Sequence, residues 1–204
     1  MTKMIDLEME TMANSAVSAV RQAQTLCKQN RRQGLAALNE LFRQGKLPET
    51  ALDGRYHGQL VALDIAPGLS PLFEAFTRWW LPWQGKAFNA SEASGNNIFT
   101  RDALPLFTIL MPSYRIRIPD TPQTFRAFNF RTYTGPGKQD LDRQVLKLDY
   151  KLPENPRLNV RRIIDELVQL EAGYYLGKAH LKTWWGRWQM VAYFSLQGNK
   201  SKQS

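Results

Sequence analysis

The 204-residue sequence has very little of the residues that build metal and redox sites, with one cysteine and two histidines. Because Cys27 has no second cysteine, an intramolecular disulfide and a paired-cysteine metal site are excluded. His57 and His180 show no metal-binding spacing, and the chain lacks a Walker loop, a dinucleotide-binding loop and a nucleophile elbow. The sequence therefore predicts no metal site, no cofactor and no catalytic residues.

Long apolar runs are missing as well. No run approaches the roughly 20 apolar residues that a membrane-spanning helix needs. The start of the chain carries Asp6, Glu8 and Glu10, which argues against a secretory signal. We therefore expect a cytoplasmic protein, with a membrane-peripheral location left open.

Positive charge and tryptophan are present in excess. The 27 Lys and Arg residues outnumber the 18 Asp and Glu residues, which gives a net charge of +9, and there are 6 tryptophans. A basic protein favours anionic partners, namely nucleic acid, acidic lipid or an anionic small molecule. Because the excess is spread along the chain, a plain solubility surface explains it equally well.

The first part of the chain has helical periodicity. Apolar residues recur three and four positions apart from Ala13 to Arg43, with a break at Gly34. The sequence predicts a flexible N-terminus over residues 1–12 and N-terminal helices over 13–48. The narrow apolar stripe indicates that these helices lie against a body or a partner.

The rest of the chain is dominated by strand patterns. Strands are predicted over Leu52–Leu63, Trp83–Asn89, Thr124–Tyr133, Val145–Tyr150, Tyr174–Thr183 and Arg187–Leu196. Helices are predicted over Leu69–Leu81, Ala103–Leu110 and Leu158–Leu170, and a loop over Ala90–Asn97. This pattern indicates an α+β fold with a small antiparallel, strongly curved sheet or lipocalin-like barrel over residues 49–197, before a disordered tail over 198–204.

Two glycine-bracketed aromatic segments, Gly54 to Gly58 and Trp83 to Phe88, carry a family resemblance. Glycine inside a strand marks a bulge, a bend or a close backbone contact. The region from about Leu52 to Asn89 resembles the GxWxG domain family of uncharacterised bacterial proteins, although Tyr56 replaces the tryptophan of that motif. This resemblance implies a bacterial, non-secreted protein and no established activity. The segment Gly173 to Lys178 is similar to the closing strands of lipocalin-like barrels, which hold an apolar ligand.

Polar residues on otherwise apolar strands form the candidate ligand-binding set. They are Asn129, Arg131, Lys147, Asp149, Lys178 and His180. If this face lines a barrel interior, its cations suit a molecule with an apolar body and an anionic head, which we expect near Arg131, Lys147 and Lys178. Simple alternation favours the opposite arrangement, in which these residues face solvent and their apolar neighbours face the core.

Exposed tryptophans are the candidate contacts for a surface or partner. The candidates are Trp79, Trp80, Trp184 and Trp185. Because Trp184 and Trp185 fall at a predicted turn, at least one of these rings should be exposed, and in a basic protein this suggests contact with an anionic membrane or a protein partner. Nucleic acid is not expected, because the ribonucleoprotein aromatic motifs are missing.

The sequence favours a non-catalytic role, the binding of a hydrophobic or amphipathic anionic small molecule such as a lipid, an isoprenoid or a pigment-like molecule. Two alternatives remain open. The first is an adaptor or assembly factor that holds a protein partner through the N-terminal helices, or an anionic membrane surface. The second is an enzyme of unrecognised type, a lyase or isomerase acting in the barrel, with His180 or Asp149 as proton carrier.

Overall fold

A computed structural model of the chain describes residues 2–64, 82–111, 114 and 118–198. The helices are α1 (Thr2–Gln29), α2 (Arg31–Gln44) and α4 (Leu104–Leu110), with short 3-10 turns η1 (Arg101–Ala103) and η2 (Val160–Arg162). The strands are β1 (Gly54–Leu63), β2 (Trp83–Asn89), β3 (Ser94–Thr100), β4 (Ile118–Thr121), β5 (Thr124–Pro136), β6 (Gln144–Asp149), β7 (Ile163–Glu171), β8 (Tyr174–Lys182) and β9 (Trp188–Gly198).

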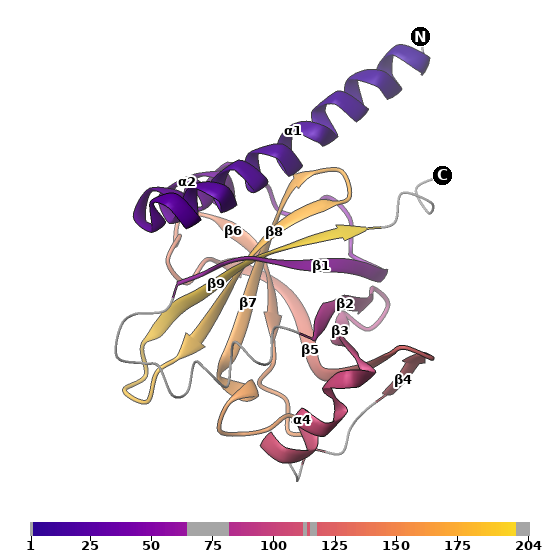
Figure 1. Cartoon of the computed structure of the whole chain (residues 1–204), viewed down its shortest axis with the longest axis vertical. Coiled ribbons are helices and arrows are strands. Elements are labelled where there is room, and N and C mark those ends of the chain that lie inside the picture. Colours follow the sequence, from indigo (N-terminus) through magenta and orange to yellow (C-terminus); the bar gives the residue numbers. More distant parts are fainter. Residues whose placement is uncertain (1, 65–81, 112–113, 115–117, 199–204) are drawn as a thin grey trace.

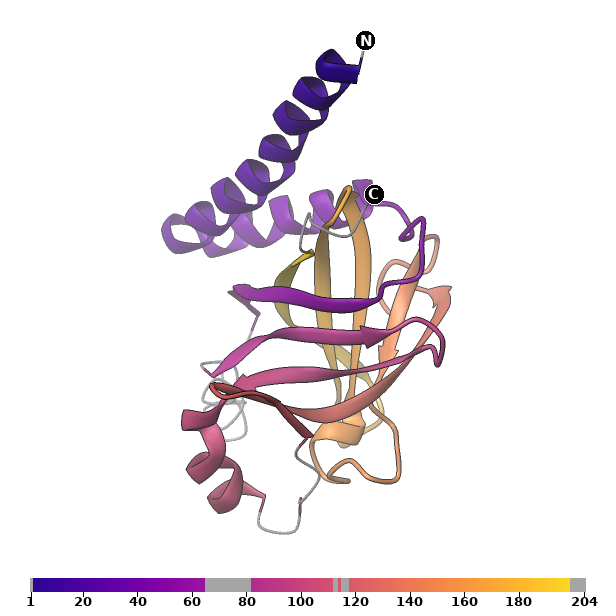
Figure 2. The ribbon, with the colours of Figure 1, turned by 90° about the vertical axis from the view of Figure 1, so that its right-hand side faces the viewer.

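The strands close into a barrel. They pair in the order β3-β2-β1-β9-β8-β7-β6-β5, every pair is antiparallel, and β3 also pairs with β5, so that eight strands form a ring. Strand β4 adds to β5 outside this ring, and Figure 2 shows the strands curving around a common interior. The expected α+β fold with an antiparallel barrel behind an N-terminal helical hairpin is confirmed. A barrel of eight strands has an interior just wide enough to be filled by side chains or to hold one small ligand.

The helical hairpin packs on the outside of the barrel wall. Its buried residues Val20, Leu38 and Phe42 belong to the same apolar cluster as Val168 and Tyr193 of the barrel. The hairpin bends at Asn30, whose side chain caps α2 by accepting a hydrogen bond from the Gln33 backbone. Figure 1 shows the N-terminal part of α1 extending beyond the barrel.

The predicted helix break at Gly34 is wrong in its position, because α1 and α2 are divided at Asn30. Gly34 lies inside α2, and a Cβ atom there would lie 2.3 Å from the backbone nitrogen of Cys27. The glycine is therefore required for the close approach of the two helices and does not end either of them.

Two predicted elements differ in the structure. The predicted helix over Leu158–Leu170 is wrong, because the segment contains η2 and then β7, which pairs with β6 and β8. Its β-branched residues favour a strand once two neighbouring strands are present. The predicted loop over Ala90–Asn97 includes the start of β3, the strand that closes the ring. The predicted helix over Leu69–Leu81 lies outside the described residues.

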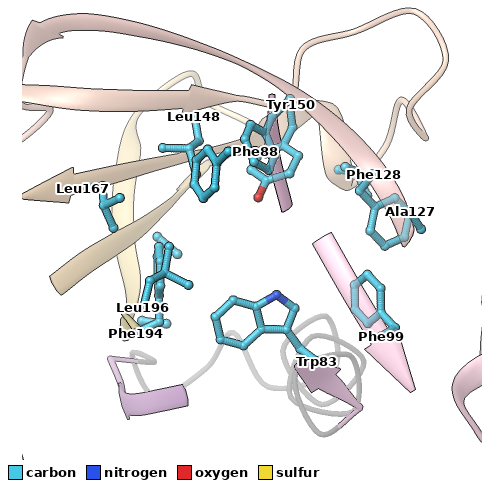
Figure 3. Packing of buried hydrophobic residues seen from close by; sticks show 14 of the residues in the cluster. Trp83, Phe88, Phe99, Ala127, Phe128, Leu148, Tyr150, Leu167, Phe194 and Leu196 are labelled. Atoms are coloured by element: carbon cyan, nitrogen blue, oxygen red, sulfur yellow. The ribbon is translucent and has the colours of Figure 1, made fainter. Parts of the chain in front are cut away.

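The wall of the barrel is buried on both faces along β6 to β9. Inward-facing side chains such as Tyr175, Ala179 and Phe194 form the interior cluster, part of which is seen in Figure 3. Outward-facing side chains such as Leu176 and Tyr193 pack against the helical hairpin. Both faces of this part of the sheet are therefore covered by other parts of the chain.

A bulge in β9 changes which of its residues face inward. The sequence predicts Trp188, Met190, Ala192, Phe194 and Leu196 on one face, but the register shifts because Ala179 pairs with Ala192 and His180 pairs with Met190. Met190 consequently belongs to the outer cluster, whereas Ala192 belongs to the interior cluster. The single-face prediction is therefore wrong at Met190, since one extra residue reverses the alternation.

The glycine-bracketed segments are packing points, as the sequence indicated. A Cβ atom on Gly58 would lie 2.3 Å from the Trp83 ring, and one on Gly85 would lie 2.0 Å from the Tyr56 carbonyl oxygen. Gly85 also has a φ of +137° and lies at a register shift between β2 and β3. These glycines allow β1 and β2 to pack closely around the Trp83 ring.

Candidate functional site

A buried lysine lies at the centre of the barrel interior. Lys86 on β2 is 2% exposed, and its ammonium group donates hydrogen bonds to Asp165 Oδ2 at 2.8 Å, Asn97 Oδ1 at 2.8 Å and the Tyr150 hydroxyl at 2.5 Å. A lysine ammonium has three protons to donate, so its hydrogen-bonding capacity is filled. The Asp165 carboxylate supplies the compensating charge.

Aromatic rings surround this ammonium group. The Lys86 nitrogen lies 5.5 Å from the ring centre of Trp83, 5.3 Å from those of Phe130 and Tyr150, and 5.2 Å from that of Phe194. Figure 3 shows Trp83, Tyr150 and Phe194 pointing toward the same part of the interior. At these distances the negative faces of the rings attract the cation.

The interior group is shielded from water, and this changes its proton affinities. Burial lowers the pKa of Lys86, and the neighbouring Asp165 carboxylate opposes this shift. Burial, together with Asp165, raises the pKa of Tyr150 well above its usual value. Because every charge is paired and hydrogen-bonded, the group can orient the strands that carry it, β2, β3 and β7, and the segment after β6.

Sequence reasoning missed this group. Lys86 stands in an apolar strand between Gly85 and Ala87, and a lysine in such a place is a signal for a buried charge that needs a partner. Its partner Asp165 falls within the predicted helix over Leu158–Leu170, so the sequence pattern does not place it on a strand of the same sheet as Lys86. The wrong assignment of β7 therefore concealed the ion pair.

A pocket of about 310 Å³ lies at one end of the barrel. This end contains the start of β1, the turn between β2 and β3, the end of β5 and the start of β6. The segment that joins α2 to β1 also belongs to the pocket wall. The lining residues are Leu47, Pro48, Glu49, Thr50, Ala51, Leu52, Phe88, Ala90, Ala93, Thr132, Tyr133, Thr134 and Leu146.

The pocket is apolar at depth and hydroxylated at its rim. Leu52 and Phe88 are buried members of the interior cluster, and Leu146 packs against that cluster. Thr132 is half-buried and Thr134 is exposed. One aromatic layer separates the pocket from the buried lysine, because the ring centres of Phe88 and Phe130 are 5.4 Å apart and Phe130 lies beside Lys86.

Three predicted ligand-binding residues lie on the outer face of the barrel wall. The Lys178 ammonium donates to Asp140 Oδ2 at 2.5 Å and to Asn39 Oδ1 at 2.7 Å. Lys147 pairs with Glu166, and His180 lies on the same face of β8 as Lys178. These side chains point neither into the barrel interior nor into solvent, so both orientations expected from the sequence are wrong for them. Their role in ligand binding stays a prediction.

These three side chains are buried because other segments of the chain cover the outer face of the barrel wall. Helix α2 supplies Asn39, and the segment between β5 and β6 supplies Asp140 and a backbone N–H of Lys138 that donates to Glu166. Polar residues on the outer face are thereby buried together with acidic partners. Burial lowers the pKa of Lys178, and the Asp140 carboxylate opposes this shift.

The other three predicted residues lie on β5 and β6. Arg131 is exposed and pairs in register with Asp149 across the two strands. The Asp149 carboxylate accepts a hydrogen bond from the Lys151 backbone, and the Asn129 carbonyl accepts one from the Asn155 side chain. Arg131 directly precedes Thr132 and Lys147 directly follows Leu146, but neither cation lines the pocket, because neighbouring side chains of a strand point to opposite faces. Of the two, Arg131 is exposed and Lys147 is buried.

His180 is poorly suited to carry a proton at neutral pH. It is fully buried, its Nδ1 atom lies 3.9 Å from Glu166 Oε2, and burial, followed by Lys178 and Lys147, lowers its pKa to about 3. A general acid or base works best when its pKa is near the operating pH. The described part of the chain therefore gives no support to His180 as a proton carrier.

The predicted contact tryptophans fall into two groups. Trp184 and Trp185, in the turn between β8 and β9, are 64% and 69% exposed. Trp79 and Trp80 lie outside the described residues.

No group of three or more His, Cys, Asp or Glu side chains could hold a metal ion among the residues described. In that part of the chain, no helix combines the length and the apolar character needed to cross a membrane.

Comparisons with protein-family models, with curated proteins and with solved structures find no match. The resemblance to the GxWxG family therefore has no family match to support it. The closed antiparallel barrel of eight strands is compatible with a lipocalin-like fold.

Proposed function

We propose that the protein binds a small amphipathic molecule, with an apolar body and an anionic head, in the pocket at the end of the barrel. The observation that carries this proposal is a hollow of about 310 Å³ with an apolar floor and hydroxyl groups at its rim. Ligand pockets in proteins have volumes of about 300–1,000 Å³ and combine apolar walls with a few polar groups. The barrel architecture is compatible with such a role.

The apolar body of the ligand would lie against Leu52, Phe88 and Leu146. These side chains already belong to or pack against the interior cluster, so they present a preformed apolar surface. Transfer of an apolar chain from water onto such a surface contributes about 25 cal/mol per Å². The body alone would therefore give measurable affinity.

The anionic head would lie at the β5 side of the rim. Thr132 and Thr134 supply hydroxyl donors, and Arg131 is exposed and makes no salt bridge within the part of the chain that the structure describes. Glu49 belongs to the same wall and would repel an anion. The head is therefore expected beside β5 and away from the segment that joins α2 to β1.

The test uses dodecanoate and its neutral analogue dodecanol as probes. Each probe is titrated into the purified, delipidated protein, and binding is measured by isothermal calorimetry and by the rise in melting temperature. We expect dodecanoate to bind more tightly than dodecanol. In Arg131→Gln the preference should fall by about twofold to fivefold, which corresponds to the loss of one exposed charge contact.

A pocket-filling variant separates this site from any other. Ala51 is exposed and lines the pocket, so Ala51→Trp places an indole ring in the hollow. Leu158→Trp adds a similar ring at an exposed position outside the pocket and serves as the control. The proposal fails if neither probe binds, or if Ala51→Trp binds dodecanoate as tightly as Leu158→Trp does.

A further inference from the structure

The turn between β8 and β9 carries two adjacent tryptophans whose rings are exposed. Trp184 and Trp185 are 64% and 69% exposed, although indole rings are usually covered in folded proteins. Figure 1 shows this turn at the lower left of the barrel, away from α1 and α2. The antiparallel order places it at the end of the barrel opposite the pocket, because the pocket adjoins the start of β1 and the turn adjoins its end.

Cationic side chains lie against Trp184 of the turn and against Trp188, the first residue of β9. The Arg162 guanidinium lies 3.8 Å from the ring centre of Trp184 and donates hydrogen bonds to the Lys182 carbonyl oxygen. The Lys138 and Lys182 ammonium groups lie 4.9 and 5.9 Å from the ring centre of Trp188. The turn therefore presents aromatic rings whose neighbours are positively charged.

Acidic residues are missing from this hairpin. Glu171 is the last Asp or Glu of the sequence, so β8, the turn and β9 contain none. Lys182 and Arg187 on the two sides of the turn are both exposed. The charged side chains of the hairpin itself are thus all cationic, which complements an anionic surface.

We propose that the β8–β9 turn binds the anionic surface of a lipid bilayer, with Trp184 and Trp185 at headgroup level. Tryptophan concentrates at membrane–water interfaces, because its ring is apolar and its N–H needs a polar partner. Lysine and arginine near an anionic leaflet add electrostatic attraction. Single-stranded nucleic acid is usually held in a groove that follows the backbone, whereas these rings lie on an exposed turn.

The test measures sedimentation of the full chain with vesicles. The vesicles contain 70% phosphatidylcholine and 30% phosphatidylglycerol, and pure phosphatidylcholine vesicles serve as the reference. We expect binding to the anionic vesicles at 0.1 M salt, weaker binding to the reference vesicles, and release at 0.5 M salt, because salt screens the attraction. Arg187→Gln should weaken the partition coefficient about fivefold, the contribution of one cation near the surface.

Matched variants separate the turn from other exposed apolar residues. Trp184→Ser combined with Trp185→Ser should lower partitioning at least tenfold, since both interfacial rings are lost. Ile109→Ser combined with Leu158→Ser removes two comparably exposed apolar side chains elsewhere and should leave partitioning unchanged. An unchanged melting temperature in both double variants shows that they fold.

Three results would overturn the proposal. They are equal binding to both vesicle types, equal partitioning of the two double variants, and tryptophan-dependent binding of single-stranded DNA with no binding to vesicles. The pocket lies at the other end of the barrel, so a failure here leaves the dodecanoate experiment unaffected, and the reverse also holds.

Discussion

Replacement of Lys86 by methionine tests the buried ion pair most directly. Methionine keeps an unbranched apolar stem but removes the charge, so Asp165 loses its counterion and retains the Tyr150 hydroxyl as a donor at 3.0 Å. Removal of one partner of a buried pair costs about 3–5 kcal/mol. For a chain of this length, where 1 kcal/mol shifts the melting temperature by about 2–4 °C, we expect Lys86→Met to melt about 6–20 °C lower.

The double variant measures how much of this loss comes from the unpaired carboxylate. Lys86→Met combined with Asp165→Leu leaves no charge in the interior, and replacement of a buried pair by apolar residues is often neutral or stabilising by about 1–4 kcal/mol. The double variant should therefore regain most of the stability lost in Lys86→Met. The sign of this coupling distinguishes an ion pair from simple packing.

Urea unfolding followed by circular dichroism gives the free energies for this cycle. Lys151→Met serves as the control, because Lys151 is exposed, and its change should stay within about 0.5 kcal/mol. The reasoning is refuted if Lys86→Met is as stable as Lys151→Met. It is also refuted if the losses of the two interior substitutions simply add in the double variant.

Two further predictions concern stability. Burial lowers the pKa of His180 from 6.5 to about 3, so the folded protein holds this side chain in its neutral form. The free energy of unfolding is therefore unaffected by His180 above pH 6.5 and falls as the pH drops from 6.5 toward 3, by about 2 kcal/mol at pH 5. Urea unfolding at pH 7 and pH 5 should show a smaller loss of stability in His180→Leu than in the wild type. His57→Leu changes an exposed histidine and serves as the control, and an equally reduced loss in this variant would contradict the prediction. Gly177→Ala should lower stability by about 1–3 kcal/mol, because its Cβ would lie 2.2 Å from the Phe194 ring. Gly135→Ala is the control, because the atom nearest to its Cβ would lie at 3.8 Å. Thermal melts in which both variants match the wild type would rule out this packing argument.

The fold class could be predicted because the strand signals are local. Alternation over Thr124–Tyr133 and Val145–Tyr150, separated by a short polar segment, predicts an antiparallel hairpin, and β5 and β6 form that hairpin. The same holds for β8 and β9. Neighbouring strands of this kind pair with few residues between them, so their pattern is sufficient to identify them.

Strand β7 could not be identified in this way. Val160, Ile163, Ile164, Leu167 and Val168 fit a helical stripe, but the segment is a strand with neighbours on both sides. The pairing with β6 and β8 supplies backbone hydrogen bonds that the local pattern does not reveal. Tertiary context therefore overrode the periodicity.

By itself, the sequence determined the composition of the two faces of each strand and the glycines at which strands must pack closely. It also marked Lys147, Lys178 and His180 as polar residues on apolar strands. Only the tertiary structure decided which face lies inside, because the helical hairpin buries the outer face of the wall as well. When both faces of a sheet are covered, the polarity of a residue no longer shows whether it faces the barrel interior or the outside. The side of the sheet on which a charged residue is buried then depends on the position of its ion-pair partner, which is Asp140 for Lys178 and Asp165 for Lys86.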